Sequence, residues 1–302
     1  MDTRLTQVLD TLSGILLGKN HEIRLSVTCL LAGGHLLIED LPGMGKTTLS
    51  HALASSIGLS YGRIQFTNDL LPADLLGYSL FNRQDNRMEF QQGPIFAQVV
   101  LADEINRASP RTQSALLEAM EERQVSIDGA TRKLPEPFFV VATQNPLEQG
   151  GTFPLPESQL DRFLMRVSLG YPTAKAERAL LEGEDRRQLT AKLKAVMTHA
   201  DVLQLQQQVQ TISASGALLD YIQRLLSASR QLPDGRHGLS PRAGLGLLRA
   251  ARAWAMLHGR EHVLPDDVQA VFPAVASHRL EQANGGGSQV TRQLIDRVPV
   301  IG

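Results

Sequence analysis

The fold of this chain is decided by the stretch Leu36-Leu37-Ile38-Glu39-Asp40-Leu41-Pro42-Gly43-Met44-Gly45-Lys46-Thr47-Thr48. Its first three residues are apolar and predict a short buried strand, and residues 47–57 carry apolar and small side chains at helical spacing. A turn with glycine and proline lies between them. A strand, a glycine-rich turn, the pair Lys-Thr and a helix together form the context of a phosphate-binding loop.

Each part of this loop has a physical use in holding phosphate. Glycine lets backbone N–H groups approach an anion closely, and a helix N-terminus adds unpaired donors and a favourable dipole. We expect Lys46 to reach the β- and γ-phosphates of a nucleotide and the Thr47 hydroxyl to bind Mg²⁺. The predicted nucleotide-binding residues of the loop are Pro42, Gly43, Met44, Gly45, Lys46, Thr47 and Thr48.

The loop departs from the usual pattern at Asp40, because that pattern has glycine five residues before Gly45. An acidic side chain beside phosphates is unexpected, so we predict that its carboxylate faces away from them. Taken alone, the motif is also compatible with an ordinary strand–turn–helix connector. The rest of the chain has to decide between the two readings.

Composition limits the class of protein. The 302 residues carry a net charge of −1 with 20% charged residues, which favours neither a nucleic-acid coat nor a membrane surface. The lone cysteine, Cys29, excludes an internal disulfide and fits a reducing compartment. No apolar run approaches the roughly 20 residues needed to span a bilayer, and we expect a cytoplasmic protein without membrane insertion.

Further apolar strands are expected at residues 62–66, 98–102, 138–143 and 163–169, with helices between them. Such alternation predicts an α/β fold, in which helices cover both faces of a parallel sheet. Hairpin patterns at 80–90 and 124–134 interrupt the alternation, and the second contains Asp128-Gly129, a strong turn signal.

Beyond residue 171 the pattern becomes helical, with no convincing strand. We therefore predict three parts: an α/β nucleotide-binding domain at 1–171, a smaller all-helical domain at 172–283, and a Gly-rich linker with a C-terminal tail at 284–302. Whether that tail is ordered is left open.

Two of the predicted strands end in polar residues that suit phosphate chemistry. Asp103 and Glu104 follow the strand at 98–102, and the carboxyl ends of parallel strands are where ligands bind. Asp103 is expected to hold Mg²⁺, and Glu104 to polarise the water that attacks the γ-phosphate. Asn145 follows the strand at 138–143 and can position water or contact the γ-phosphate, although Asn before proline is also common in turns.

Two arginines complete the candidate set. Arg162 precedes the last predicted strand, and Arg242 opens a helix with Ser240 as its cap. A guanidinium suits phosphate recognition because it is planar and stays charged. For either arginine alone, a surface ion pair is an open alternative.

Taken in this order and spacing, the residues resemble the AAA+ ATPases. The loop at 39–47 resembles Walker A and residues 99–104 resemble Walker B, while Asn145 resembles sensor 1, Arg162 the arginine finger and Arg242 sensor 2. The hairpins resemble the helix-2 insert and the pre-sensor-1 hairpin of one clade. That clade contains MoxR proteins, magnesium chelatase subunits and minichromosome-maintenance helicases. The stretches most similar to MoxR signatures are residues 63–67, 102–108, 142–146 and 155–163.

The resemblance implies a P-loop domain with an all-helical lid, assembled in a ring, usually a hexamer. ATP and Mg²⁺ would bind between subunits with the arginine finger acting in trans, and Leu17 and Gly18 would lie near the adenine. It also implies that ATP hydrolysis drives chaperone-like remodelling or maturation of a partner protein, often one with a von Willebrand factor A domain, including metal-cofactor insertion.

Three alternatives remain open. The chain could be a nucleic-acid-associated motor or a magnesium-chelatase-like metallation ATPase of the same clade, or a nucleotide switch that does not hydrolyse. Neither hairpin carries the excess of basic residues that a phosphate-backbone footprint requires, which argues against nucleic acid as a partner. The intact Lys46, Asp103 and Glu104 argue against the switch. A metal-protease pattern at 258–262 is interrupted by Gly259 and predicts a helix end instead.

Replacing Lys46 tests the phosphate loop directly. Lys46→Ala removes the cation that faces the β- and γ-phosphates, so we expect nucleotide binding to be lost in a direct binding titration. Arg162→Ala is the matched control, because its arginine is assigned to hydrolysis and not to binding, and it should bind nucleotide normally. If the Lys46→Ala variant still bound nucleotide, the assignment of this stretch as a phosphate-binding loop would be wrong.

Overall fold

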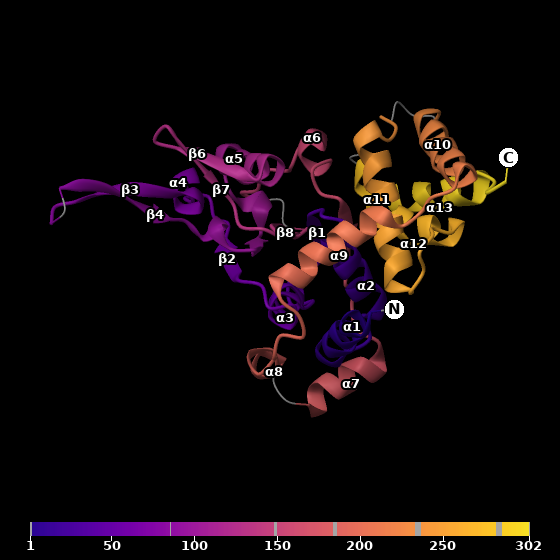
Figure 1. Ribbon diagram of the computed structural model, residues 1–302, viewed down its shortest axis with the longest axis horizontal. Helices are drawn as coiled ribbons and strands as arrows, with labels where there is room; N and C mark the ends of the chain where they lie inside the picture. Colours follow the sequence, from indigo (N-terminus) through magenta and orange to yellow (C-terminus); the bar gives the residue numbers. More distant parts are fainter. Residues whose placement is uncertain are drawn as a thin grey trace.

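A five-stranded parallel sheet lies at the centre of the N-terminal half of the chain (Figure 1). The computed structural model describes residues 2–84, 86–147, 150–183, 186–232, 237–281 and 286–301. The strands are β1 (Leu36–Glu39), β2 (Tyr61–Gln65), β5 (Val99–Asp103), β8 (Phe139–Gln144) and β9 (Met165–Val167), in the order β2-β5-β8-β1-β9. The parallel sheet predicted from the alternation of apolar strands and helices is confirmed.

Alternate residues of the central strands enter two different cores. Val99 and Leu101 of β5 pack with helices α1 (Thr3–Ile15), α2 (Asn20–Leu31) and α3 (Lys46–Ser56). Val100 and Ala102, which point to the opposite face, pack with α5 (Pro110–Glu122) and the short η2 (Ile105–Arg107). Because both faces are covered, the central strands β1, β5 and β8 are apolar until they reach their carboxyl ends and do not alternate with polar residues.

The strand register places the chemistry at one edge of the sheet. Glu39 at the end of β1 pairs with Gln144 of β8, and Gln65 of β2 pairs with Asp103 of β5. Parallel strands deliver their carboxyl ends to the same edge. The residues that follow β1, β5 and β8 are therefore gathered there.

Both predicted hairpins are present and lie outside the sheet. Helix α4 (Pro72–Leu76) leads into β3 (Gly77–Asn82) and β4 (Arg87–Gln92), which project away from the sheet before η1 (Pro94–Phe96), a 3₁₀ turn (Figure 1). Asp85, in the turn predicted for this hairpin, lies outside the described residues. The second hairpin pairs β6 (Gln124–Ile127) with β7 (Ala130–Lys133) through Asp128 and Gly129, both at positive φ, as the sequence predicts.

The described residues after β9 are helical. Helices α6 (Glu157–Leu160) and α7 (Ala174–Glu182) flank β9, and the others are α8 (Arg186–Ala191), α9 (His199–Thr211), α10 (Gly216–Arg230), α11 (Pro241–Leu257), α12 (Pro265–Ala276), η3 (Ser277–Arg279) and α13 (Gly287–Arg297). Hydroxyl caps open several of them, including Ser240 at α11, whose Oγ accepts the N–H of Ala243.

The C-terminal tail, whose order the sequence does not predict, contains a helix. α13 buries Val290 and Leu294 and packs against α12 and η3. Residues 284 and 285 of the predicted linker lie outside the described residues, as do 282 and 283. The domain limits at 171/172 and 283/284 stay predictions. In the described part of the chain, no helix is both long and apolar enough to cross a membrane.

The helical part packs closely on the N-terminal helices. α11 lies against α2, and the apolar residues of α1, α2 and α3 form one continuous core with those of α9 to α13. Within the sheet domain, the loop before β1 lies close to Leu164, just before β9. A Cβ on Gly34 would lie 2.3 Å from the Cβ of Leu164, a distance that real contacts do not reach.

Gly34→Ala should therefore lower the free energy of unfolding by about 1–3 kcal/mol, because the added methyl overpacks the contact with Leu164. Gly14→Ala is the control: it lies in α1 with open space around it, and alanine favours helix by roughly 1 kcal/mol over glycine. Denaturant titration measures both. Equal stability of the two variants would contradict the predicted close packing at Gly34.

Candidate functional site

The phosphate loop joins β1 to α3 with a geometry that only glycine readily adopts. Gly43 has φ +82° and Gly45 has φ +93°, both in the left-handed region. Gly45 is the N-cap of α3, and no side chain caps this helix. The N–H groups of its first turn are therefore available to an anion, and the helix dipole favours one there.

Lys46 crosses the mouth of the loop. Its Nζ donates to the carbonyl of Asp40 at 2.6 Å and to that of Gln144 at 3.4 Å. Burial lowers the pKa of this amine, and the neighbouring carboxylates of Asp40, Asp103 and Glu104 oppose the shift. The ammonium group is thus held between the ends of β1 and β8, facing the acids at the end of β5.

The departure at Asp40 has a structural explanation. Its carboxylate is buried and accepts hydrogen bonds from the backbone N–H of Leu169 at 2.5 Å and of Gly170 at 2.7 Å. It also accepts from the Ser168 hydroxyl at 3.2 Å and from the N–H of Leu41. In agreement with the prediction, the side chain does not line the nucleotide pocket. Asp40 ties the start of the loop to the segment that leaves β9.

The two acids after β5 are joined through a threonine. The Thr143 hydroxyl donates to Asp103 Oδ1 at 2.7 Å and accepts the backbone N–H of Glu104 at 2.9 Å. Glu104 has φ +58°, a conformation uncommon outside glycine and one that costs roughly 1–3 kcal/mol. This strain turns its carboxylate out of the strand direction and toward the pocket.

Both carboxylates have partners that the sequence analysis did not assign to the site. Arg63 donates to Asp103 Oδ2 at 2.7 Å, and Gln65 donates from its amide to Glu104 Oε2 at 3.0 Å. Arg107 lies 3.3 Å from the same oxygen of Glu104. In the sequence, Arg63 and Gln65 stand out only as part of a stretch that resembles the MoxR family. Their spacing of two residues on β2 could have predicted that both side chains lie on one face of the strand that neighbours β5.

These groups surround one pocket of about 640 Å³. Among its lining residues are the predicted Pro42, Gly43, Gly45, Lys46, Thr47, Thr48, Asp103, Glu104 and Asn145, together with the unpredicted His51, Arg63 and Thr190. Met44 is not among them; it is half-buried and packs against the core. Loop, acids and Asn145 are thus brought together, although they lie up to about a hundred residues apart in the chain.

Leu17 and Gly18 do not line this pocket. They form the turn between α1 and α2, where Gly18 has φ +74° and would meet Ala176 of α7 if it carried a Cβ. Their neighbour Leu16 does approach the loop, with its Cδ2 3.4 Å from the position of a Cβ on Gly45. Contact of Leu17 and Gly18 with adenine stays a prediction.

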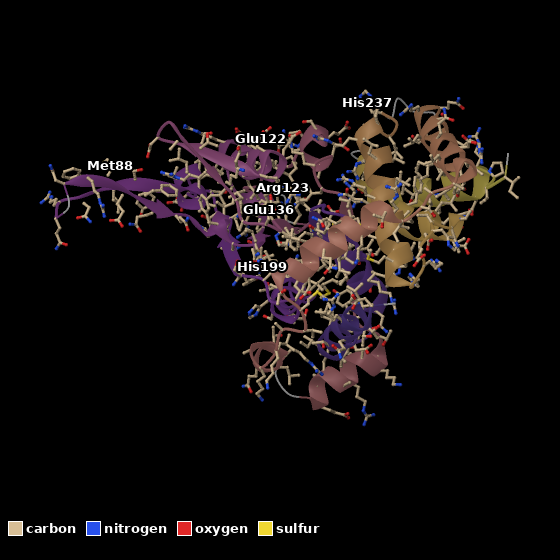
Figure 2. All side chains as sticks on the ribbon, viewed as in Figure 1. Met88, Glu122, Arg123, Glu136, His199 and His237 are labelled. Atoms are coloured by element: carbon tan, nitrogen blue, oxygen red, sulfur yellow. The ribbon has the colours of Figure 1, made fainter. Side chains whose placement is uncertain are left out.

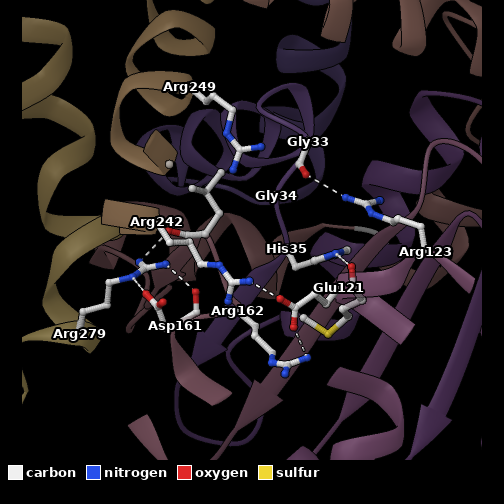
Figure 3. A pocket seen from close by; sticks show the side chains of 13 residues that line it. Gly33, Gly34, His35, Glu121, Arg123, Asp161, Arg162, Arg242, Arg249 and Arg279 are labelled. Atoms are coloured by element: carbon white, nitrogen blue, oxygen red, sulfur yellow. Dashed lines mark hydrogen bonds and ion pairs between the residues drawn. The ribbon is translucent and has the colours of Figure 1, made fainter. Parts of the chain in front are cut away.

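The two predicted arginines lie in a separate pocket of about 190 Å³ (Figure 3). Arg162, from the segment before β9, places its NH1 2.7 Å from Glu121 Oε2. Arg242, in the first turn of α11, pairs with the other oxygen of the same carboxylate. Neither arginine lines the pocket of the phosphate loop. The structure therefore places most of the predicted site residues around one pocket and the two arginines in another, while Leu17, Gly18 and Met44 line neither.

Comparison with known proteins identifies the family. Residues 35–165 match the model of the ATPase family associated with various cellular activities (AAA), and residues 227–298 match an AAA lid domain. The chain is 46% identical to the uncharacterised protein YeaC of Bacillus subtilis, covering 91% of this chain and 86% of that one. It is 41% identical to Chaperone MoxR1 of Mycobacterium tuberculosis, covering 88% and 72%, and 38% identical to Protein MoxR of Paracoccus denitrificans, covering 89% and 86%.

The chain belongs to the MoxR family of AAA+ ATPases. The crystal structure of a putative ATPase from Cytophaga hutchinsonii is similar over its whole length, with 34% identity, a TM-score of 0.86, and coverage of 98% of this chain and 93% of that one. The resemblance inferred from the motifs is thus confirmed. The fold inferred with it, a P-loop sheet followed by a helical lid, is confirmed as well.

The metal-protease pattern at 258–262 is a helix end in this family member. α11 ends at Leu257, and Gly259 has φ +71°, so the two histidines do not share a helix face. Among the residues that the structure describes, no group of three His, Cys, Asp or Glu side chains could hold a metal.

Asp40→Ala tests the tie between the phosphate loop and residues 168–170. It leaves the N–H groups of Leu169 and Gly170 without their acceptor, and each unsatisfied donor costs about 1–3 kcal/mol. We expect the free energy of unfolding to fall by about 2–3 kcal/mol in denaturant titrations. The exposed Asp10 of α1 supplies the control, since Asp10→Ala should change it by less than about 0.5 kcal/mol. Similar losses in both variants would contradict the tie.

Proposed function

We propose that this chain hydrolyses ATP with Mg²⁺ in a hexameric ring of identical copies, and that the reaction drives remodelling of a partner protein. The observation that carries the proposal is the division of the site. The phosphate loop and the acids share one pocket, while Arg162 and Arg242 line another. A nucleotide held by one copy then meets the arginines of its neighbour.

Phosphate binding falls to the first turn of α3 and to Lys46. The N–H groups of that turn are uncapped, and Gly43 leaves open space beside the loop, with no atom within 4 Å of where its Cβ would stand. An Nζ that is held by two backbone carbonyls can exchange them for phosphate oxygens, which are stronger acceptors because they are charged.

Thr47 and Asp103 are the proposed holders of Mg²⁺. Both present oxygen atoms, the donor type that this ion prefers, and both line the pocket. Asp103 already pairs with the guanidinium of Arg63, so the carboxylate is placed where a cation is stabilised. Bound there, Mg²⁺ would neutralise charge on the transferred phosphoryl group.

Glu104 is the proposed general base, which takes a proton from the attacking water. Its strained backbone aims the carboxylate into the pocket, and the amide of Gln65 holds one of its oxygens. Asn145, at the end of β8, lines the same pocket and would orient the water or the γ-phosphate. Arg162 and Arg242 of the neighbouring copy would then stabilise the negative charge on the transferred phosphoryl group. An arginine supplied in trans contributes roughly 10³–10⁵ in rate in related NTPases.

The surface of the β3–β4 hairpin supports a protein as the client. Leu80, Phe81 and Met88 are 50%, 56% and 62% exposed, and Figure 2 labels Met88 on this projecting element. Exposed apolar side chains favour contact with protein over a phosphate backbone. Arg132 of the other hairpin lies over the ring of Phe90, at 3.9 Å from its centroid. That basic side chain is already engaged, which weakens the nucleic-acid alternative.

The identity of the client rests on the family. A relative named Chaperone MoxR1 supports a remodelling role. We propose a von Willebrand factor A domain protein as the partner, in the cytoplasm, with maturation or metal-cofactor insertion as the outcome. A chelatase-like metallation role differs only in the partner and is separated from this one by copurification.

Glu104→Gln and Arg162→Ala test the reaction and its division between copies. Each variant alone should lose phosphate release by at least about 10³-fold, since one lacks the base and the other the arginine. In an equal mixture, roughly a quarter of the heterologous interfaces pair an intact Glu104 with an intact Arg162. The mixture should therefore recover roughly that share of the wild-type rate.

Three results would contradict the proposal. No phosphate release by the assembled wild-type protein would rule out the proposed ATPase activity. Turnover by Arg162→Ala at the wild-type rate would show that Arg162 is not the arginine finger. A mixture as inactive as its components would place the arginine in the same copy as the phosphate loop that it serves.

A further inference from the structure

Glu121 joins two arginines that come from distant parts of the chain. It lies in the last turn of α5, and each oxygen of its carboxylate pairs with one guanidinium, Oε2 with Arg162 at 2.7 Å and Oε1 with Arg242. Figure 3 shows both arginines converging on this single carboxylate. Arg162 also donates to the carbonyl of Leu117, one turn earlier in α5. Glu121 therefore links Arg162 of the sheet domain to Arg242 of α11.

Three other charged groups of this pocket, Arg279, Arg123 and Asp161, have structural partners. Arg279 is 7% exposed and is bound to Asp161 at 2.6 Å and to the carbonyl of Phe163. Arg123 donates to the carbonyls of Phe138 and Gly33. These two cations and Asp161 hold the chain together, so they are not free to exchange partners.

Arg249 adds a further positive charge to the pocket lining. The pocket lining thus contains five arginines but only two carboxylates, Glu121 and Asp161, and Asp161 is engaged by Arg279. His35 contributes no charge near neutral pH, because burial lowers its pKa to about 3. The excess of positive charge makes this a site for an anion.

The contacts of Glu121 are exchangeable. Its side chain is 34% exposed, and those of Arg162 and Arg242 are 30% and 50% exposed. Ion pairs at this exposure are weak, because solvent screens the charges and the long side chains lose freedom when they pair. A phosphate group forms bidentate contacts with guanidinium groups, as a carboxylate does, and a polyphosphate carries more negative charge than one carboxylate. A phosphate that reaches this pocket can therefore replace the carboxylate.

We propose that Glu121 is a placeholder for phosphate: it holds Arg162 and Arg242 in the free subunit and releases them to the terminal phosphates of a nucleotide carried by a second copy of this chain. This inference rests on the proposed function, since it requires the two arginines to act in trans. Glu121 is then a positioning residue that opposes association, because two ion pairs must be broken before the neighbour's phosphates are bound. Both arginines also lower the pKa of Glu121, so the placeholder is charged at neutral pH.

Glu121→Gln tests this through the concentration dependence of the ATPase. The amide keeps the shape of the side chain but removes the charge that competes with phosphate. Half-maximal ATPase should occur at a protein concentration roughly threefold to tenfold lower than in the wild type, because two exposed ion pairs no longer have to be broken. Glu122→Gln is the matched control. It removes the same charge from the next residue of α5, which is exposed (Figure 2), and should leave the concentration unchanged.

A purely structural role makes the opposite prediction. If Glu121 only braced α5 against α11, its loss would weaken the interface, and half-maximal activity would require a higher protein concentration. That result, or one equal to Glu122→Gln, would overturn the proposal while wild-type hydrolysis left the proposed function intact. If Glu121→Gln does not fold, Glu121→Asp replaces it. Its shorter carboxylate cannot reach both arginines, and the same downward shift is expected.

A binding measurement avoids hydrolysis altogether. Inorganic tripolyphosphate is titrated calorimetrically into the Lys46→Ala variant, in which the phosphate loop no longer binds phosphate. The double variant with Glu121→Gln should bind tripolyphosphate roughly threefold to tenfold more tightly, and the double variant with Arg162→Ala should lose most of the binding. Equal affinities with and without Glu121→Gln, or binding that survives the loss of Arg162, would show that the carboxylate does not compete for this pocket.

Discussion

The parallel pairing of β5, β8 and β1 is the constraint on which the chemistry of this protein depends. The pairing aligns Leu101 with Val141 and Leu36 with Val141, so the three strands end at one edge of the sheet. The Thr143 hydroxyl then joins the end of β8 to both acids after β5. A shift of one residue in any of these strands would exchange the side chains that pack in the two cores and would move the polar ends apart. Burial of the strands on both faces is therefore what holds the proposed catalytic groups in place.

Charge compensation is the second feature that runs through the structure. The carboxylate of Asp40 accepts hydrogen bonds from backbone N–H groups. The carboxylate of Asp103 is paired with Arg63, and that of Glu121 with two arginines. Buried or half-buried charges are costly unless they are paired or hydrogen-bonded. Asp40 is buried and held mainly by backbone N–H groups, which suits a structural tie. The arginines that pair with Asp103 and Glu121 are partly exposed and can be exchanged, which suits carboxylates proposed to meet a metal ion or to give way to phosphate.

The two pockets of one chain make sense as halves of a shared site. One pocket has the uncapped helix, the lysine and the acids, and the other has an excess of arginine. Under the proposed function, dividing the reaction in this way would link hydrolysis to assembly, because neither pocket would be complete alone. The close packing of α11 on α2 sets the position of Arg242 relative to Arg162, so the lid and the sheet domain together build the second half.

The sequence by itself determined the local elements and the family to which the chain belongs. Apolar runs of strand length, the Asp128-Gly129 turn and the order of Lys46, Asp103, Asn145 and Arg162 carry their meaning over short distances, and each was read correctly as structure or as family. Only the tertiary structure decided which groups meet. The partners of Asp40, the contacts of Arg63 and Gln65 with the acids, and the capture of Arg162 and Arg242 by Glu121 join segments 39 to 130 residues apart. Such pairings depend on strand order and helix packing, and a local sequence pattern contains neither.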